Sequence, residues 1–350
     1  MSGGRSVLGY TGAMRTIEYQ RAGGPEVLSL VERDVPEPGP GQVRVRMAVS
    51  GVNPTDWKSR CSTDPVGGAQ TPNQDGSGTV DAVGSGVDAA RVGERVWLWE
   101  GAHDNRFGTA AQYSVLPDRR AVAMPDWVPF DLGAALGVPF LTAHRCLTLG
   151  ELVPDRLGPG TLDGVHVLVH GGAGAVGNAA IQLARWSDAT VIATVSSPAK
   201  AQLAAAAGAD HVLNYREQDV VEHVHRIVPG GVAAVVEVSA AANAAIDAQV
   251  LATHGAVAMY ADDGGEQVTL PVRAQMMRNA RWQFVLVYTL AMAAKYDAID
   301  AISAAVDSGA LRIGAHAGLP LHRFALADTG AAQQAVQDGV VGKVLIDIDQ

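Results

Sequence analysis

Cysteine is scarce in this sequence, and so is positive charge. Two of the 350 residues, Cys61 and Cys146, are cysteines. Two cysteines exclude a disulfide framework and a structural zinc lobe with four cysteine ligands. Lys and Arg number 26 against 36 Asp and Glu, which gives a formal net charge of −10. Such a chain repels nucleic acids and anionic membranes on average, so neither is an expected partner.

A hydrophobic run long enough to span a membrane is also missing. The longest apolar stretch, residues 232–261, is interrupted by polar residues, and a span needs roughly 20 apolar residues. Residues 1–13 contain Gly and Ser but no apolar segment of the signal-peptide type. We therefore expect a mobile leader over residues 1–13, a fold that begins near Met14 and a cytoplasmic protein.

Two hydrophobic patterns divide the rest of the chain. In the first third, Val43, Val45, Met47 and Val49 alternate with other residues, which is the period of a half-buried strand. After about Leu136, strand-like runs alternate with helical ones. Strands are predicted at 165–170, 191–196, 211–215, 232–239, 256–261 and 282–288, and helices at 175–186, 199–207, 242–252 and 328–338. Alternation of this kind predicts an α/β fold with a parallel sheet covered by helices.

The sharpest motif is a glycine pattern between a predicted strand and a predicted helix. Gly172, Gly174 and Gly177 match G-x-G-x-x-G, in which the glycines permit a tight turn, approach of the backbone to a pyrophosphate and close packing of helix on strand. The helix start, with Ala175 and Val176, would offer free N–H groups and a positive dipole end to phosphates. The alternative is a glycine-rich turn without a ligand.

An acidic residue is lacking about 20 residues further on, where NAD-binding proteins hold the ribose 2′-hydroxyl. Ser196, Ser197 and Lys200 stand there instead. Hydroxyls and a positive charge suit a 2′-phosphate, so the predicted cofactor is NADPH. The alternative for Lys200 is a solvated position on a helix.

Together with these motifs, further segments resemble the medium-chain dehydrogenase/reductase superfamily, in its zinc-free, zeta-crystallin-like quinone reductase branch. They occur in the family order at residues 51–56, 74–80, 83–87, 92–96, 137–143, 165–177, 214–216 and 342–344. The resemblance implies a doubly wound Rossmann domain over 138–289 and a β-rich, GroES-like catalytic domain over 14–137 and 290–350. An active site in the cleft between them is expected.

The resemblance also implies roles for individual residues near the reacting groups. Asn53 and Thr142 would lie near the nicotinamide and the acceptor, where the Asn53 amide could donate to a carbonyl oxygen as negative charge develops on it. A loop-stabilising Asn before a proline is the alternative. Asp56, Trp57 and Trp99 would line the acceptor pocket, although tryptophans more often pack in a core.

Two further expectations come from the resemblance. Lys200 and Tyr215 correspond to residues that contact the 2′-phosphate in relatives; the alternative for Tyr215 is an aromatic side chain that covers the sheet end. Residues 281–288 correspond to a strand that pairs across a two-fold axis, so a homodimer through the Rossmann domain is expected. An ordinary internal strand is the alternative.

The zinc ligands of the wider family are missing. Asn53 stands where zinc-using relatives carry Cys, and residues 73–75, Asn-Gln-Asp, replace Gly-His-Glu. A catalytic zinc needs three such ligands, so no metal is expected. His144, His166 and His170 are interpreted as core or strand residues rather than ligands.

Without a Lewis acid, alcohol oxidation is disfavoured, whereas hydride transfer from NADPH to an electron-poor acceptor requires mainly orientation and exclusion of water. The leading hypothesis is therefore metal-free, NADPH-dependent reduction of quinones. An alkenal or enone reductase would use the same site. A non-catalytic cofactor-binding or RNA-binding protein of the crystallin kind is a second alternative, and the net charge and the lack of a basic cluster argue against RNA. No dedicated proton donor is evident.

Overall fold

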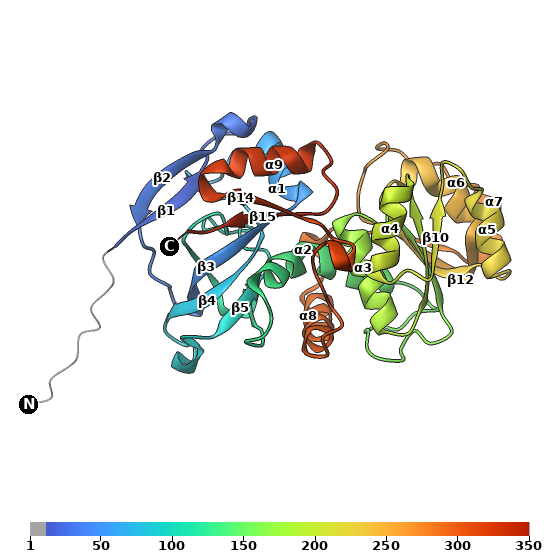
Figure 1. Ribbon diagram of the computed structural model, residues 1–350, viewed down its shortest axis with the longest axis horizontal. Helices are drawn as coiled ribbons and strands as arrows, with labels where there is room; N and C mark the ends of the chain where they lie inside the picture. Colours follow the sequence, from blue (N-terminus) through green and yellow to red (C-terminus); the bar gives the residue numbers. More distant parts are fainter. Residues whose placement is uncertain (1–11, 350) are drawn as a thin grey trace, which may run out of the picture. The chain divides into compact units, whose positions relative to one another are not determined.

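The structure, a computed structural model, describes residues 12–349 (Figure 1). The expected leader therefore lies outside the described residues except for its last two positions, and the first strand begins at Ala13. Contacts divide the chain into two compact units. Unit 1 comprises Met1–Ala123, Arg323–Asp338 and Val344–Gln350, and unit 2 comprises Met124–His322 and Gly339–Lys343.

Unit 2 is built around a parallel sheet. Its strands are β8 (His166–His170), β9 (Thr190–Val195), β10 (His211–Asn214), β11 (Val232–Glu237), β12 (Leu251–Met259) and β13 (Arg281–Phe284). They lie in the order β10-β9-β8-β11-β12-β13, and the registered pairs are all parallel. The direction of winding therefore reverses between β8 and β11, which is the doubly wound topology, and the predicted parallel sheet is confirmed.

Helices cover both faces of this sheet (Figure 1). They are α2 (Phe130–Leu147), α3 (Ala175–Trp186), α4 (Pro198–Ala207), α5 (Val220–Ile227), α6 (Ala240–Val250), α7 (Val272–Arg278) and α8 (Met292–Asp307). Helices α3 and α4 pack on β8, β9 and β10, while α6 packs on β11 and β12. The central strands can be continuous apolar runs, such as the fully buried Val167, Leu168 and Val169, because both faces are covered.

The unit boundaries differ from those expected from the sequence. Positions 137/138 divide the 18-residue helix α2, which continues to Leu147 and packs on α3 and β11. Residues 292–307, which the expected bounds place in the other domain, form helix α8, and this helix packs on α2 and α3. Both helices therefore belong to unit 2, because α2 packs on α3 and β11 and α8 packs on α2 and α3.

Unit 1 is mostly β-structure. Strands β1 (Ala13–Glu18) and β2 (Ser29–Asp34) pair with each other. The larger sheet runs β14-β15-β3-β4-β5-β7, with β6 also on β3. Its strands are β3 (Gln42–Val52), β4 (Asp75–Val83), β5 (Arg95–Leu98), β6 (Tyr113–Pro117), β7 (Ala121–Ala123), β14 (Leu321–Ala325) and β15 (Lys343–Asp347). The alternation predicted for Val43 to Val49 is confirmed in β3, where the four apolar side chains are buried.

Two helices of unit 1 pack together, α1 (Pro54–Ser62) and α9 (Thr329–Gln337). Short 3-10 turns complete the chain at Pro25–Val27, Ala89–Arg91, Asp118–Arg120, Val287–Thr289, Ala315–Ala317 and Leu326–Asp328. Among residues 12–349, no helix combines the length and apolar character that a membrane crossing requires. A cytoplasmic location stays a prediction.

Candidate functional site

The glycine motif forms the turn between β8 and α3. Strand β8 ends at His170, and α3 begins at Ala175 with Gly174 as its N-cap residue, which has no side chain to cap the helix. The N–H of Gly172 donates to the carbonyl of Thr194 on β9 at 3.1 Å. The first-turn amides of Ala175, Val176 and Gly177 therefore start at the carboxyl edge of the sheet without a capping side chain from Gly174. A helix start of this kind attracts phosphate.

Different constraints favour glycine at the three positions of the motif. A Cβ at Gly177 would lie 2.3 Å from the carbonyl oxygen of Gly171, and one at Gly172 would lie 2.9 Å from the Cβ of Ala193. Packing within the protein explains these two. At Gly174 the nearest such atom is 3.4 Å away and φ is −81°, so the fold itself admits a side chain. The absence of one leaves the backbone of the helix start open to a ligand.

Ser196 and Tyr215 come together where β9 and β10 end. Val195 pairs with Asn214 in the sheet, and the N–H of Tyr215 donates to the carbonyl of Val195 at 3.1 Å. Tyr215 is half exposed. Strand register thus places Ser196 and Tyr215 side by side, although they come from separate parts of the sequence. Their contact with a phosphate stays a prediction.

Ser197 and Lys200 occupy the first turn of α4. The Ser197 hydroxyl caps this helix by accepting from the N–H of Lys200 at 3.3 Å, so Ser197 has a structural role. Lys200 is half-buried. Arg216, which directly follows Tyr215 and is exposed, adds a second cation to the same edge. Sequence reasoning gave it no role, although its charge next to Tyr215 was a usable signal.

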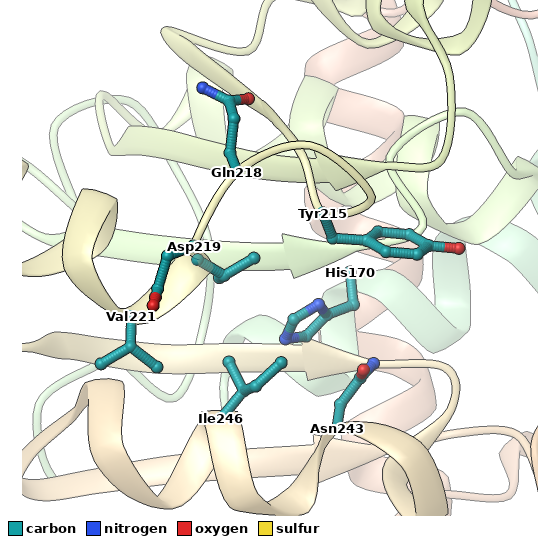
Figure 2. Close-up of a pocket in the computed structure, with 8 residues that line it drawn as sticks. His170, Tyr215, Gln218, Asp219, Val221, Asn243 and Ile246 are labelled. Atoms are coloured by element: carbon teal, nitrogen blue, oxygen red, sulfur yellow. The ribbon is translucent and has the colours of Figure 1, made fainter.

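A pocket of about 320 Å³ lies within unit 2 (Figure 2). Its lining residues are His170, Tyr215, Gln218, Asp219, Val220, Val221, Asn243 and Ile246. Figure 2 shows the His170 imidazole between Tyr215 on one side and Asn243 and Ile246 on the other. The pocket thus combines an aromatic ring, aliphatic side chains and a few polar groups, which is the usual composition of a small-molecule site.

The floor of this pocket belongs to a buried polar cluster. His170 Nε2 lies 2.9 Å from Asp247 Oδ1 and 3.5 Å from Glu237 Oε2, and His170 Nδ1 lies 2.8 Å from the Thr194 hydroxyl. Glu237 also accepts the N–H of Ser239 and, at 3.1 and 3.2 Å, the side-chain amide of Asn243. His170 is a buried strand residue, as expected, but sequence reasoning missed the cluster because its members come from distant segments.

Burial and charge act in opposite directions within this cluster. Burial by itself lowers the pKa of His170, but the hydrogen bond to Asp247 and the charges of Asp247 and Glu237 raise it above its ordinary value. Burial raises the pKa of Glu237 to about 7, against the opposing effect of the His170 charge. The cluster therefore retains protons at pH values where an isolated glutamate would be ionised.

In unit 1, Asn53 holds a second group of buried acids. Its backbone N–H donates to Asp56 Oδ2 at 2.7 Å, and its side-chain amide donates to Asp75 Oδ2 at 2.7 Å. Asn53 is also the N-cap of α1, followed by Pro54. The loop-stabilising alternative is therefore supported, and Asp56 is engaged in this capping box. Sequence reasoning missed Asp75 as the group that orients the Asn53 amide.

The remaining candidates lie in different surroundings. Trp57 is half-buried, and its indole N–H has no hydrogen-bond partner among the described residues. Trp99 is completely buried, donates its indole N–H to the Arg119 carbonyl at 3.2 Å and packs in the core of unit 1. Thr142 is a buried residue of α2 in unit 2. Trp99 thus has the commoner, structural role of a tryptophan.

The doubly wound sheet and its open glycine turn define a dinucleotide-binding protein. Two family models match the chain, "Alcohol dehydrogenase GroES-like domain" over residues 39–126 and "Zinc-binding dehydrogenase" over residues 175–305. Human quinone oxidoreductase is 31% identical over 256 residues, which cover 72% of this chain and 74% of the relative.

Solved structures agree with this relationship. A mycobacterial protein in complex with NADPH is 28% identical, with a TM-score of 0.77 over 95% of this chain and 99% of the other. An NAD-dependent alcohol dehydrogenase is 28% identical, with a TM-score of 0.80 over 96% and 100%. The chain belongs to the medium-chain dehydrogenase/reductase superfamily, in its quinone oxidoreductase branch. It is an oxidoreductase with a Rossmann-type and a GroES-like domain.

Proposed function

We propose that this protein reduces quinones with NADPH by hydride transfer, without a catalytic metal. The observation that carries the proposal is Gly174. The fold would admit a side chain there, yet the position is open at the start of a helix at the carboxyl edge of a parallel sheet. This is the arrangement in which a pyrophosphate contacts main-chain amides.

The residues of unit 2 fit a dinucleotide with a 2′-phosphate. The pyrophosphate would contact the amides that follow Gly174, and the adenosine half would use the pocket beside Tyr215. Ser196 and Lys200, with Tyr215, would hold the 2′-phosphate through hydroxyl donors and a positive charge. An acid that would repel this phosphate is absent from the sequence between 194 and 200. When bound, NADPH supplies the hydride, while the protein orients it.

In unit 1, Asn53 and Trp57 are the proposed contacts to the acceptor. Asp75 fixes the Asn53 amide, so its orientation is set before an acceptor arrives. A preoriented amide can stabilise negative charge that develops on a carbonyl oxygen. The half-buried Trp57 ring suits a flat acceptor. Residues 73–75 offer Asn, Gln and Asp in place of the zinc ligands of relatives, which supports a metal-free mechanism.

The test is NADPH oxidation with a panel of quinones, 2-alkenals and enones, with and without a metal chelator. Turnover with quinones that the chelator leaves unchanged is the expected result. Turnover with alkenals or enones alone would reassign the acceptor class within the same site. Loss of activity in the chelator would overturn the metal-free mechanism. Binding of NADPH without turnover on any acceptor would favour a non-catalytic role.

We also propose a homodimer through unit 2. Strand β13 is one of the two edge strands of the sheet among the described residues, and Phe284 on it is 72% exposed. An exposed edge strand with an apolar side chain such as Phe284 is a site at which a second copy can extend the sheet. Sedimentation of the wild type and of Phe284→Glu tests this proposal: a dimer that becomes a monomer supports it, and a monomeric wild type contradicts it.

A further inference from the structure

The buried cluster of His170, Glu237 and Asp247 lies at the point where the sheet reverses its winding. His170 is the last residue of β8, and Glu237 is the last residue of β11, the strand beside it. Asp247 reaches the cluster from α6, and all three side chains are buried. Dinucleotides bind above this reversal point, so the cluster lies under the proposed cofactor site.

The geometry of the cluster requires a hydrogen atom on the imidazole nitrogen that faces the acids. His170 Nε2 faces two carboxylates, and their potential ligand atoms all lie within 4.8 Å of one another. A bare nitrogen lone pair would repel both. A zinc ion with bonds of about 2.0 to 2.1 Å would hold its ligand atoms roughly 3.3 Å apart. The separation of 2.9 Å between His170 Nε2 and Asp247 Oδ1 is instead that of a hydrogen bond, so a proton on Nε2 fills this gap.

Hydrogen bonds connect this proton to both loops that frame the proposed site. On one side, His170 contacts the hydroxyl of Thr194, whose carbonyl accepts the N–H of Gly172 in the phosphate loop. On the other side, Glu237 accepts the N–H of Ser239 and the amide of Asn243, which lines the pocket. A change of charge in the cluster therefore acts on the two loops together.

We propose that the His170–Glu237–Asp247 cluster is a positioning site that holds protons beneath the cofactor and makes the affinity for an anionic dinucleotide depend on pH. This inference rests on the proposed NADPH site. With His170 charged and Glu237 neutral, one positive charge balances the Asp247 carboxylate. Loss of a proton leaves net negative charge below the pyrophosphate, which weakens binding because like charges repel strongly in a poorly solvated site.

Other titratable groups near the cluster do not supply this proton. Tyr260 follows β12, and its pKa is raised well above its ordinary value by burial and by nearby charges, including Glu237, so it stays neutral. Thr194 on β9 does not ionise in this range. Tyr215 and Asp219 line the other side of the pocket. Glu237, whose carboxyl faces His170 and accepts from Ser239 and Asn243, is the group whose ionisation the proposal invokes.

The experiment is calorimetric titration of the full chain with NADPH and with NADH between pH 6.5 and 8.5, in buffers of different ionisation enthalpy. NADH lacks the 2′-phosphate, whose own pKa lies near 6, and so controls for it. For both dinucleotides, binding should take up protons, and Kd should rise by up to about tenfold per pH unit above neutrality. Glu237→Gln, neutral at every pH, should abolish the proton uptake and flatten the profile. Glu222→Gln, an exposed glutamate of α5, should change neither.

Two results would overturn the proposal. One is an unchanged pH profile in Glu237→Gln and in Asp247→Asn. The other is a stoichiometric divalent metal in the purified protein that these variants lose. The ¹⁵N shifts of the His170 ring give a readout without cofactor: both ring nitrogens should be protonated at pH 7.5, and a neutral ring contradicts the proposal. If neither dinucleotide binds at any pH, the cofactor proposal fails, while the ring shifts still test the cluster.

Discussion

The two units each bury acidic side chains, but they stabilise them in different ways. In unit 1, Asp75 accepts an amide of Asn53, and Asp56 accepts a backbone N–H. In unit 2, Glu237 and Asp247 both lie against the imidazole of His170. Amide donors keep their hydrogens at any ordinary pH, whereas an imidazolium and a buried carboxyl can lose theirs. The comparison suggests that unit 1 holds its proposed site by fixed hydrogen bonds and unit 2 by titratable ones.

The largest expected effect is that of Gly174→Val, which tests whether this glycine contacts a ligand or has a structural role. Gly174→Val should raise the Kd of NADPH at least about 100-fold, or about 2.7 kcal/mol, because the side chain would occupy the approach to the helix start. The fold should tolerate it, since the position admits a Cβ. Gly230→Ala, in open space, is the control. Equilibrium titration and thermal unfolding measure both quantities. An unchanged Kd of NADPH in Gly174→Val would contradict the assignment of the phosphate loop.

The next effect concerns the hydrogen bonds of unit 1. Asn53→Ala should destabilise the protein by about 1 to 3 kcal/mol, because it removes an N-cap and leaves a buried oxygen of Asp75 without this donor. Asn53→Asp should cost more, since it places a third carboxyl beside Asp56 and Asp75. Denaturant unfolding measures the loss. If Asn53→Ala matched the wild type in stability while losing turnover, Asn53 would be purely catalytic.

A pH series then tests the titratable cluster of unit 2. Folded Glu237 keeps its proton up to about pH 7, whereas the unfolded residue releases it near its ordinary 4.5. Folding therefore takes up a proton between these values, and stability falls as pH rises through this window. Glu237→Gln should be more stable than the wild type by about 1 to 3 kcal/mol at pH 8.5, and the two should be equal near pH 4. Parallel stability curves would contradict the raised pKa.

The smallest effect concerns the choice of cofactor. Lys200→Ala should raise the Kd of NADPH by about fivefold to tenfold and leave the Kd of NADH unchanged, because one charge-assisted contact to the 2′-phosphate is lost. Arg226→Ala, on the exposed face of α5, is the matched control. Side-by-side titrations measure the ratio of the two affinities. Equal weakening of both cofactors would place Lys200 away from the 2′-phosphate.

Local patterns predicted the parts of the fold that depend on local sequence. Helix α3 was predicted at 175–186 and is observed at Ala175–Trp186, because a contiguous strand, glycine turn and apolar helix face define it. Helices α8 and α5 are among those for which the sequence analysis predicted no range. In α8, alanines occupy both the buried and the exposed face, so the two faces of the helix differ little in hydrophobicity and the helical period is hard to detect. Helix α5 has only eight residues, too few for a clear period, although its apolar side is pronounced.

The candidate site divides in the same way. The position of the glycine turn and the neighbouring placement of Ser196 and Tyr215 could be predicted, since strand ends of a parallel sheet meet at one edge. The partnership of His170 with Asp247 could not, because 77 positions separate them and no motif joins them. Trp99 was expected in a pocket and is in a core, because composition does not reveal the direction of a side chain.

The most direct test of the account is titration of the wild-type protein with NADPH and NADH under identical conditions, followed through tryptophan fluorescence. The account predicts that both bind and that NADPH binds at least about tenfold more tightly, because the corner at Ser196, Lys200 and Tyr215 adds phosphate contacts. Equal affinities would contradict the phosphate corner but leave the glycine turn in place. Failure of both to bind would contradict the central claim that unit 2 is a dinucleotide site.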